Sequence, residues 1–140
     1  MSSANLDLVR SIFTSWERGD FSSVGWAHPE IELVAPDGPE PGTWLGLEGM
    51  AEGWRDWLHA FKDFRVEVHE YRELDRERVL VLIRRIGYGK ASGVDLGRVG
   101  SEGACLFHIA DRKVTRFVGY WNRGLAFAEL GLRSAPEAPG

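Results

Sequence analysis

The sequence predicts an α+β fold, with helices packed on the concave face of a cone-shaped, curved, mixed β-sheet. Helical periodicity is concentrated in the first half of the chain, whereas alternating apolar and polar residues dominate from Phe64 onwards. Gly87, Gly89 and Gly93 would allow the long strands to bend sharply, as a strongly curved sheet requires. A sheet of this shape, crossed by helices, forms a natural small-molecule cavity at its mouth.

Three helices are expected before the sheet is complete. The first covers 5–18, with Asn5 as its cap and Arg18-Gly19 as its end. A short second helix is expected over 21–27, ended by Pro29. The third, over 47–61, has the strongest signal, because one broad apolar stripe recurs at helical spacing: Leu47, Met50, Ala51, Trp54, Trp57, Leu58 and Phe61.

Five strands are expected, over 30–36, 64–71, 78–89, 101–109 and 113–121, and a last helix follows Asn122. The segment 30–36 leads into the turn-rich "PDGPEPG". The segment "RVLVLI" at the start of 78–89 is apolar at successive positions, so this strand should be covered on both faces.

Composition describes one globular domain, because 140 residues suffice for a single core and are too few for two ordinary domains. The net charge is −4 and no basic run exceeds Arg84-Arg85, which disfavours a nucleic-acid partner. No apolar run reaches membrane-spanning length and no leader-like segment is evident, so no membrane partner and a cytoplasmic location are expected. The Pro- and Ala-rich tail over 133–140 is expected to be flexible.

Neither a metal nor a cofactor is expected. The four histidines form no local pair at metal-binding spacing, and Cys105 is the only cysteine. No Gly-x-Gly-x-x-Gly motif leads from a strand into a helix, so a nucleotide site has no support.

Three segments, "HPEIELVAPDGPEPGTWLGLEGMAEGWRDWLHAFKDFRVEV", "RRIGYGKASGVDL" and "FHIADRKVTRFVGYWNRGLAFAELGL", resemble the SnoaL-like branch of the nuclear transport factor 2-like superfamily. The resemblance runs from Leu6 to Leu132 and marks 1–132 as a single domain. It implies a cone-shaped α+β fold, a hydrophobic pocket and a homodimer joined through the sheet. Polyketide cyclases, ketosteroid isomerases, small epoxide hydrolases and non-catalytic binders share this fold, so the fold alone does not assign a function.

The catalytic groups of the isomerases are replaced in this chain. Their first helix carries a tyrosine that serves as the oxyanion donor, and here that helix has Phe13 and Trp16. Their catalytic base precedes the proline after the first strand, where this sequence has Ala35. Their second, protonated aspartate falls near Cys105. Steroid isomerisation is therefore not expected.

In the cyclase branch an acid–base aspartate ends the last long strand, and the resemblance implies that Asn122 occupies this position here. An amide cannot take up a proton near neutral pH. Asn122 is interpreted first as a helix cap and second as a polar pocket contact, and the two roles are compatible. The epoxide hydrolases use an Asp–Arg–Asp arrangement. Asp95, Arg98 and Glu102 lie close in sequence here, but Asn122 again replaces the distal aspartate.

Two weak candidates for a catalytic base are left. If Cys105 faces the cavity, strand alternation places Phe107 with it and Glu102 on the other face, unless a bulge reverses the assignment. His28 precedes Pro29 at the expected end of the second helix, where a capping or surface role is the alternative.

The residues expected to bind a ligand are mainly aromatic side chains, for each of which plain core packing is the alternative: Trp26, His28, Trp44, Trp57, Phe61, Cys105, Phe107, Trp121 and Asn122. The first hypothesis is a non-catalytic or weakly catalytic binder of a small, ring-containing hydrophobic molecule. The alternative is an acid–base enzyme of the isomerase, polyketide cyclase or epoxide hydrolase type that uses Glu102 or His28. A third is a dimerising scaffold whose cavity is filled by tryptophans.

Overall fold

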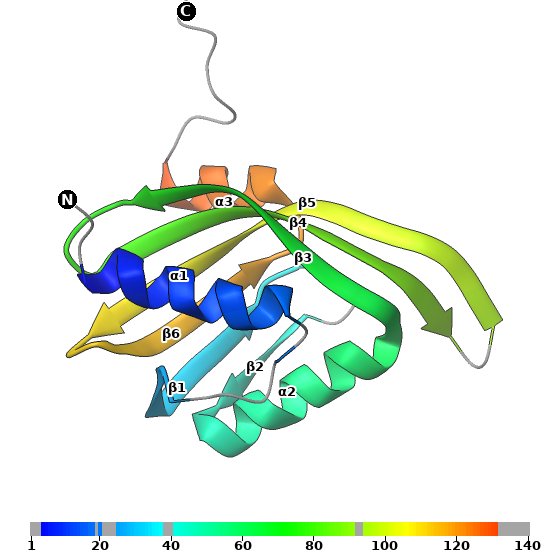
Figure 1. Ribbon diagram of the computed structural model, residues 1–140, viewed down its shortest axis with the longest axis horizontal. Helices are drawn as coiled ribbons and strands as arrows, with labels where there is room; N and C mark the ends of the chain where they lie inside the picture. The colour runs from blue at the N-terminus through cyan, green and yellow to red at the C-terminus, as the bar shows by residue number, and fades with distance from the viewer. Residues whose placement is uncertain (1–3, 19, 21–24, 38–40, 92–93, 132–140) are drawn as a thin grey trace, which may run out of the picture.

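The computed structural model describes residues 4–18, 20, 25–37, 41–91 and 94–131, and of these only the backbone at 57–64, 88–91 and 94–101. The elements follow in the order α1 (Ala4–Glu17), β1 (Ala27–Ala35), β2 (Gly42–Leu45), α2 (Gly46–Ala60), β3 (Phe61–Glu73), β4 (Arg78–Ala91), β5 (Val94–Ala110), β6 (Lys113–Tyr120) and α3 (Arg123–Leu130) (Figure 1).

The strands form one sheet in the order β2-β1-β6-β5-β4-β3. Strand β1 runs parallel to β6, whereas the other neighbours are antiparallel, so the sheet is mixed as predicted. The sheet curves around α1 and α2 (Figure 1). The α+β fold with a curved mixed sheet is confirmed, with the difference that α3 packs on the opposite face from α1 and α2.

The two faces of β4 explain this three-layer arrangement. Val79, Val81 and Ile83 belong to the core cluster that contains α1, whereas Leu80 and Leu82 belong to the cluster that contains α3. Successive side chains of a strand point to opposite faces, so a strand covered on both sides must be apolar throughout. The prediction that this strand is buried on both faces is confirmed.

Helix α1 follows the expected apolar spacing, with Val9, Ile12, Phe13 and Trp16 buried against the sheet. Its start differs from the prediction, because Asn5 lies inside the helix. The Asn5 side-chain amide donates to the Arg76 carbonyl oxygen at 2.7 Å and so ties the helix to the β3–β4 turn.

The helix expected over 21–27 is wrong at its C-terminal end. Residues 21–24 lie outside the described part of the chain, but Ala27 and His28 open strand β1. Ala27 pairs with Val114 of β6, so a contact with a distant strand decides its conformation. The short strand β2 was not predicted, and the expected tail over 133–140 lies outside the described residues.

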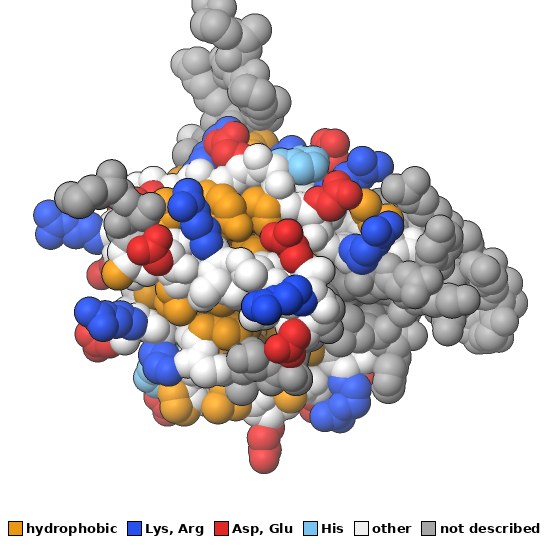
Figure 2. Space-filling model, viewed as in Figure 1, with side chains coloured by type: hydrophobic (Ala, Val, Ile, Leu, Met, Phe, Trp, Pro, Cys, Tyr) orange, Lys and Arg blue, Asp and Glu red, His pale blue; other side chains and the backbone are white. Residues whose placement is uncertain are grey.

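Charged side chains of both signs are interspersed over the molecular face shown in Figure 2, and hydrophobic side chains lie between them. Within the described part of the chain, no helix is long and apolar enough to cross a membrane.

Candidate functional site

A cavity of about 90 Å³ lies between the concave face of the sheet and the two helices that cover it. One buried water needs roughly 10–15 Å³ by the same measure, so the space corresponds to about six to nine waters. The lining combines aromatic, aliphatic and a few charged residues: Trp16, Leu33, Val34, Ala35, Asp37, Trp44, Gly53, Trp54, Asp56, Val66, Ile83, Arg85, Cys105, Phe117, Gly119 and Trp121.

Part of the wall is a cluster of aromatic rings contributed by three elements. The Trp16 ring lies 5.1 Å from the Trp54 ring and 5.9 Å from the Phe117 ring, and Trp54 and Phe117 are 6.0 Å apart, centroid to centroid. Such edge and tilted contacts are the preferred geometry of aromatic pairs. The cluster gives the cavity a rigid apolar surface suited to a flat ring.

Arg85 breaks this apolar pattern. Among the described side chains it is the only charged one that is buried, with 7% of its surface exposed. Its Nη1 donates to the Tyr120 carbonyl oxygen at 2.6 Å, Nη2 lies 3.9 Å from Cys105 Sγ, and Cζ lies 5.9 Å from the centre of the Trp121 ring. None of the ion pairs in the described part of the chain involves it.

The space that the Arg85 guanidinium occupies exists because residue 103 is a glycine, and Gly119 lies on its other side. A Cβ on Gly103 of β5 would lie 2.1 Å from Nη1 and 2.4 Å from the Tyr120 oxygen. A Cβ on Gly119 of β6 would lie 3.4 Å from Nη2. Arg85 therefore crosses the adjacent strand β5 at Gly103 to reach the carbonyl group at the end of β6.

Burial is the largest cause of the pKa shifts of Arg85 and Cys105, the two ionisable groups that meet here. It lowers the pKa of Arg85, and interactions with Cys105 and Asp37 oppose that shift. It raises the pKa of the Cys105 thiol to about 11, with the Arg85 charge acting in the opposite direction. Cys105 is therefore a neutral thiol near pH 7, which does not suit a nucleophile.

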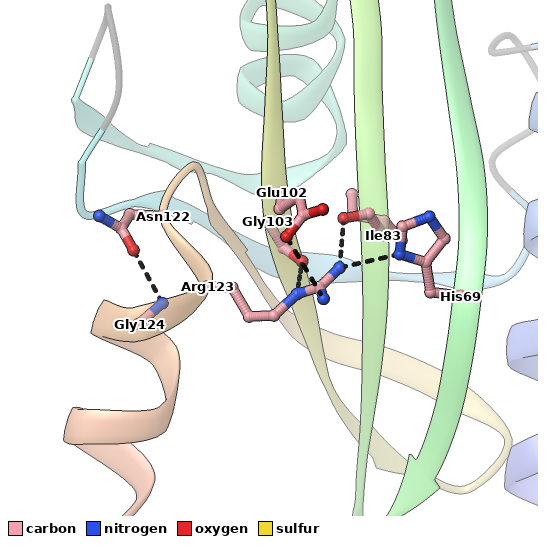
Figure 3. Close-up of polar contacts among 7 residues, drawn as sticks. All are labelled: His69, Ile83, Glu102, Gly103, Asn122, Arg123 and Gly124. Atoms are coloured by element: carbon pink, nitrogen blue, oxygen red, sulfur yellow. Dashed lines mark hydrogen bonds and ion pairs between the residues drawn. The ribbon is translucent and has the colours of Figure 1, made fainter. Parts of the chain in front are cut away.

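Asp37 organises the junction between β6 and α3. Its Oδ1 accepts the Trp121 backbone N–H at 2.7 Å, and its Oδ2 accepts the Asn122 backbone N–H at 2.9 Å. Asn122 is the N-cap of α3, where its side-chain oxygen accepts the Gly124 N–H at 2.8 Å (Figure 3). The interpretation of Asn122 as a helix cap is confirmed. Its side chain is exposed and is not among the cavity lining.

Three of the predicted ligand-binding residues line the cavity, namely Trp44, Cys105 and Trp121. Two others pack elsewhere. Trp26 lies against the Trp16 ring at the edge of the core, and Phe107 is fully buried between Phe13 and Phe117. For Trp57 and Phe61 the structure describes only the backbone, so their predicted ligand contacts lie outside the described side chains.

The two candidate bases lie outside the cavity lining. Glu102 has 69% of its side chain exposed and pairs with Arg123 at 4.0 Å, next to the Gly103 carbonyl (Figure 3). Strand alternation explains this, because Glu102 and Cys105 point to opposite faces of β5. His28 lies in β1, and its Nδ1 accepts the Glu30 backbone N–H at 2.9 Å, a local contact that fixes the ring.

Sequence reasoning missed Arg85, Asp37 and Asp56, the three charged residues of the lining. The pattern held a signal for Arg85, because it follows Val81 and Ile83 on a strand face that is otherwise apolar. A charged side chain on a buried face indicates a functional role more strongly than an apolar side chain there does. In the described part of the chain, no group of three or more His, Cys, Asp or Glu side chains could hold a metal ion.

Solved structures share this fold at low sequence identity. TerC, co-crystallised with polyporic acid, is 23% identical with a TM-score of 0.71, over 91% of this chain and 98% of that one. A nuclear transport factor 2-like protein of unknown function from Burkholderia pseudomallei is 18% identical with a TM-score of 0.73, and the match covers 96% of this chain and 100% of that one. A Jannaschia protein that carries the designation SnoaL-like polyketide cyclase is 16% identical with a TM-score of 0.71, and the match covers 95% of this chain and 94% of that one.

No curated protein matches the chain. The family model of the SnoaL-like domain matches residues 9–117, which extend from α1 into β6 and include most of the cavity wall. This chain belongs to the SnoaL-like domain family.

Proposed function

We propose that the protein binds a small, ring-containing, largely apolar molecule in the cavity and that it is non-catalytic or weakly catalytic. The observation that carries the proposal is the cavity itself, which lies on the concave face and is lined by Trp16, Trp44, Trp54 and Trp121. Ligand sites are mostly apolar concave spaces with a few placed polar groups. That TerC has been crystallised with polyporic acid supports a small organic ligand in this fold.

The loss of acidic groups supports binding without efficient proton transfer. The family resemblance places two isomerase aspartates at Ala35 and Cys105, and both of these residues line the cavity. A methyl group cannot carry a proton, and a thiol with a pKa of about 11 is a poor base at neutral pH. The tryptophan-filled scaffold is less favoured, because the rings leave open space between them.

The test combines a ligand screen with a blocked cavity. Purified protein is heated with steroids, aromatic polyketides, terpenoid epoxides and fatty acids, and a ligand at 100 times its Kd should add about 2.7 kcal/mol of stability. Ala35→Phe should fill the cavity and abolish the shift. The same exchange at the exposed Ala110, the last residue of β5, should preserve it. An equal shift in the wild type and in Ala35→Phe would place the ligand elsewhere.

Acid–base catalysis is a second candidate, favoured by the two carboxylates of the lining, Asp37 and Asp56. These groups have better access to a bound molecule than Glu102 or His28. The test is turnover of any ligand from the screen by the wild type, Asp37→Asn and Asp56→Asn. Loss of turnover with binding retained would assign the base, whereas equal turnover in all three would contradict the assignment.

The homodimer joined through the sheet stays a prediction from the family resemblance. Its test is the molar mass in solution by size-exclusion chromatography with light scattering. A mass close to that of one 15.7 kDa chain over a wide concentration range would contradict it.

A further inference from the structure

Arg85 is a cationic group held inside an apolar cavity, and no carboxylate of the described side chains forms an ion pair with it. Its surroundings in the lining are the Cys105 thiol, the Trp121 ring and the Gly119 backbone. Taking a guanidinium out of water costs free energy unless a counter-charge and hydrogen bonds compensate it. In the described residues the compensation is incomplete, because one nitrogen donates to a carbonyl oxygen and another faces only a sulfur atom.

Asp37 is the carboxylate whose charge acts on Arg85, but both of its oxygens accept backbone N–H groups of the β6–α3 junction. It forms no ion pair with Arg85, although its charge acts on the guanidinium. Asp56, the other acidic residue of the lining, is exposed to solvent, which screens its charge. Within the described side chains, the Tyr120 carbonyl and the Cys105 sulfur are the hydrogen-bond partners of Arg85, so its other donors are available to a molecule that enters the cavity.

The guanidinium is also fixed in place. Gly103 provides the space for it, the Tyr120 carbonyl accepts from Nη1, and the Trp121 ring lies within cation–π distance. A planar guanidinium held in this way presents its other nitrogens in a fixed geometry, which suits a carboxylate or another anionic oxygen better than a mobile lysine would.

We infer that Arg85 is an anion-binding subsite of the cavity and that the ligand carries an acidic oxygen, such as a carboxylate, on its ring system. This inference rests on the proposed function, because it needs a ligand in the cavity. The aromatic cluster of Trp16, Trp54 and Phe117 contacts the ring, and Arg85 binds the acidic group.

The test uses two probes of the same shape, 2-naphthoate and 2-naphthamide, which differ in charge. Binding is measured by quenching of tryptophan fluorescence and by calorimetry. The wild type should prefer the carboxylate by about tenfold or more, as expected for a hydrogen bond to a charged group. Arg85→Met should lose this preference while still binding the amide, and Arg85→Lys should retain part of it.

The matched control is Arg84→Met, the same exchange at the exposed neighbouring residue, and it should keep the full preference. Equal affinity of the wild type for both probes, or an unchanged preference in Arg85→Met, would overturn the anion subsite and leave the proposed function intact. If the wild type bound neither probe at millimolar concentration, both proposals would be overturned for ligands of this class.

Discussion

Gly103→Ala tests whether the Arg85 guanidinium crosses β5 where the structure places it. The added Cβ would lie 2.1 Å from Nη1 and 2.4 Å from the Tyr120 oxygen, so one of these groups must move. Overpacking of a core costs about 1–3 kcal/mol. Displacing Arg85 also forfeits its hydrogen bond to Tyr120, and a bond to a charged group contributes about 1.5–3 kcal/mol. Together these contributions lower the free energy of unfolding by about 2.5–6 kcal/mol.

The assay is thermal and urea unfolding followed by circular dichroism. For 140 residues the expected loss lowers Tm by about 9–20 °C. Gly25→Ala is the matched control, because a Cβ there meets nothing within 4 Å, and it should change stability by less than about 0.5 kcal/mol. If Gly103→Ala were as stable as Gly25→Ala, the guanidinium would not occupy this space and the argument for a fixed Arg85 would fail.

Two further predictions concern the helix cap and the pH dependence of stability. Asn122→Ala should lower the unfolding free energy by about 1 kcal/mol, and Asn122→Ser should recover most of it, since serine caps helices about as well. Equal urea midpoints for the wild type and the alanine variant would contradict the cap. His108 pairs with Arg78 on one neighbouring strand and Arg116 on the other, and burial together with these charges lowers its pKa below 6.5. The unfolded chain then binds a proton more readily than the native one, so His108 contributes stability above pH 6.5 that is lost as the pH falls through its folded-state pKa. His108→Gln should therefore flatten the decline in urea midpoint between about pH 8 and 5, and an unchanged slope would show that His108 is not its source.

Local patterns predicted the parts of the fold that depend on local physics. The period of 3.6 in the first helix records which of its side chains are buried. The strand around Cys105 is buried on both faces, and its alternation assigns Cys105 and Phe107 to the face of α1 and Ala104 and Leu106 to the face of α3. The opposite orientations of Cys105 and Glu102 follow from that alternation alone. Segment 21–27 could not be predicted in the same way, because Ala27 becomes extended by pairing with Val114, which lies far along the chain.

The candidate site was predicted less completely, for a physical reason. Trp44, Cys105 and Trp121 line the cavity as expected, but aromatic content alone does not separate a wall residue from a packed one such as Phe107. Arg84-Arg85 resembles an exposed pair of charges. Arg85 points inwards because it shares the face of Val81 and Ile83 on a strand that is covered on both sides, and because Gly103 of the neighbouring strand leaves space for its guanidinium.

If Arg85 is retained for binding, it should add little to the stability of the ligand-free protein. Arg85→Met removes the desolvated charge, which favours folding, but leaves the Tyr120 carbonyl without this donor, a cost of about 1–3 kcal/mol. These contributions oppose each other, so the variant should unfold within about 1 kcal/mol of the wild type. With 2-naphthoate at 100 times the wild-type Kd, the wild type alone should gain about 2.7 kcal/mol. Urea titrations with and without the probe measure both quantities. A loss above about 3 kcal/mol in the ligand-free variant would instead show that Arg85 is required for folding, because a group retained for binding stabilises the protein mainly when its partner is present.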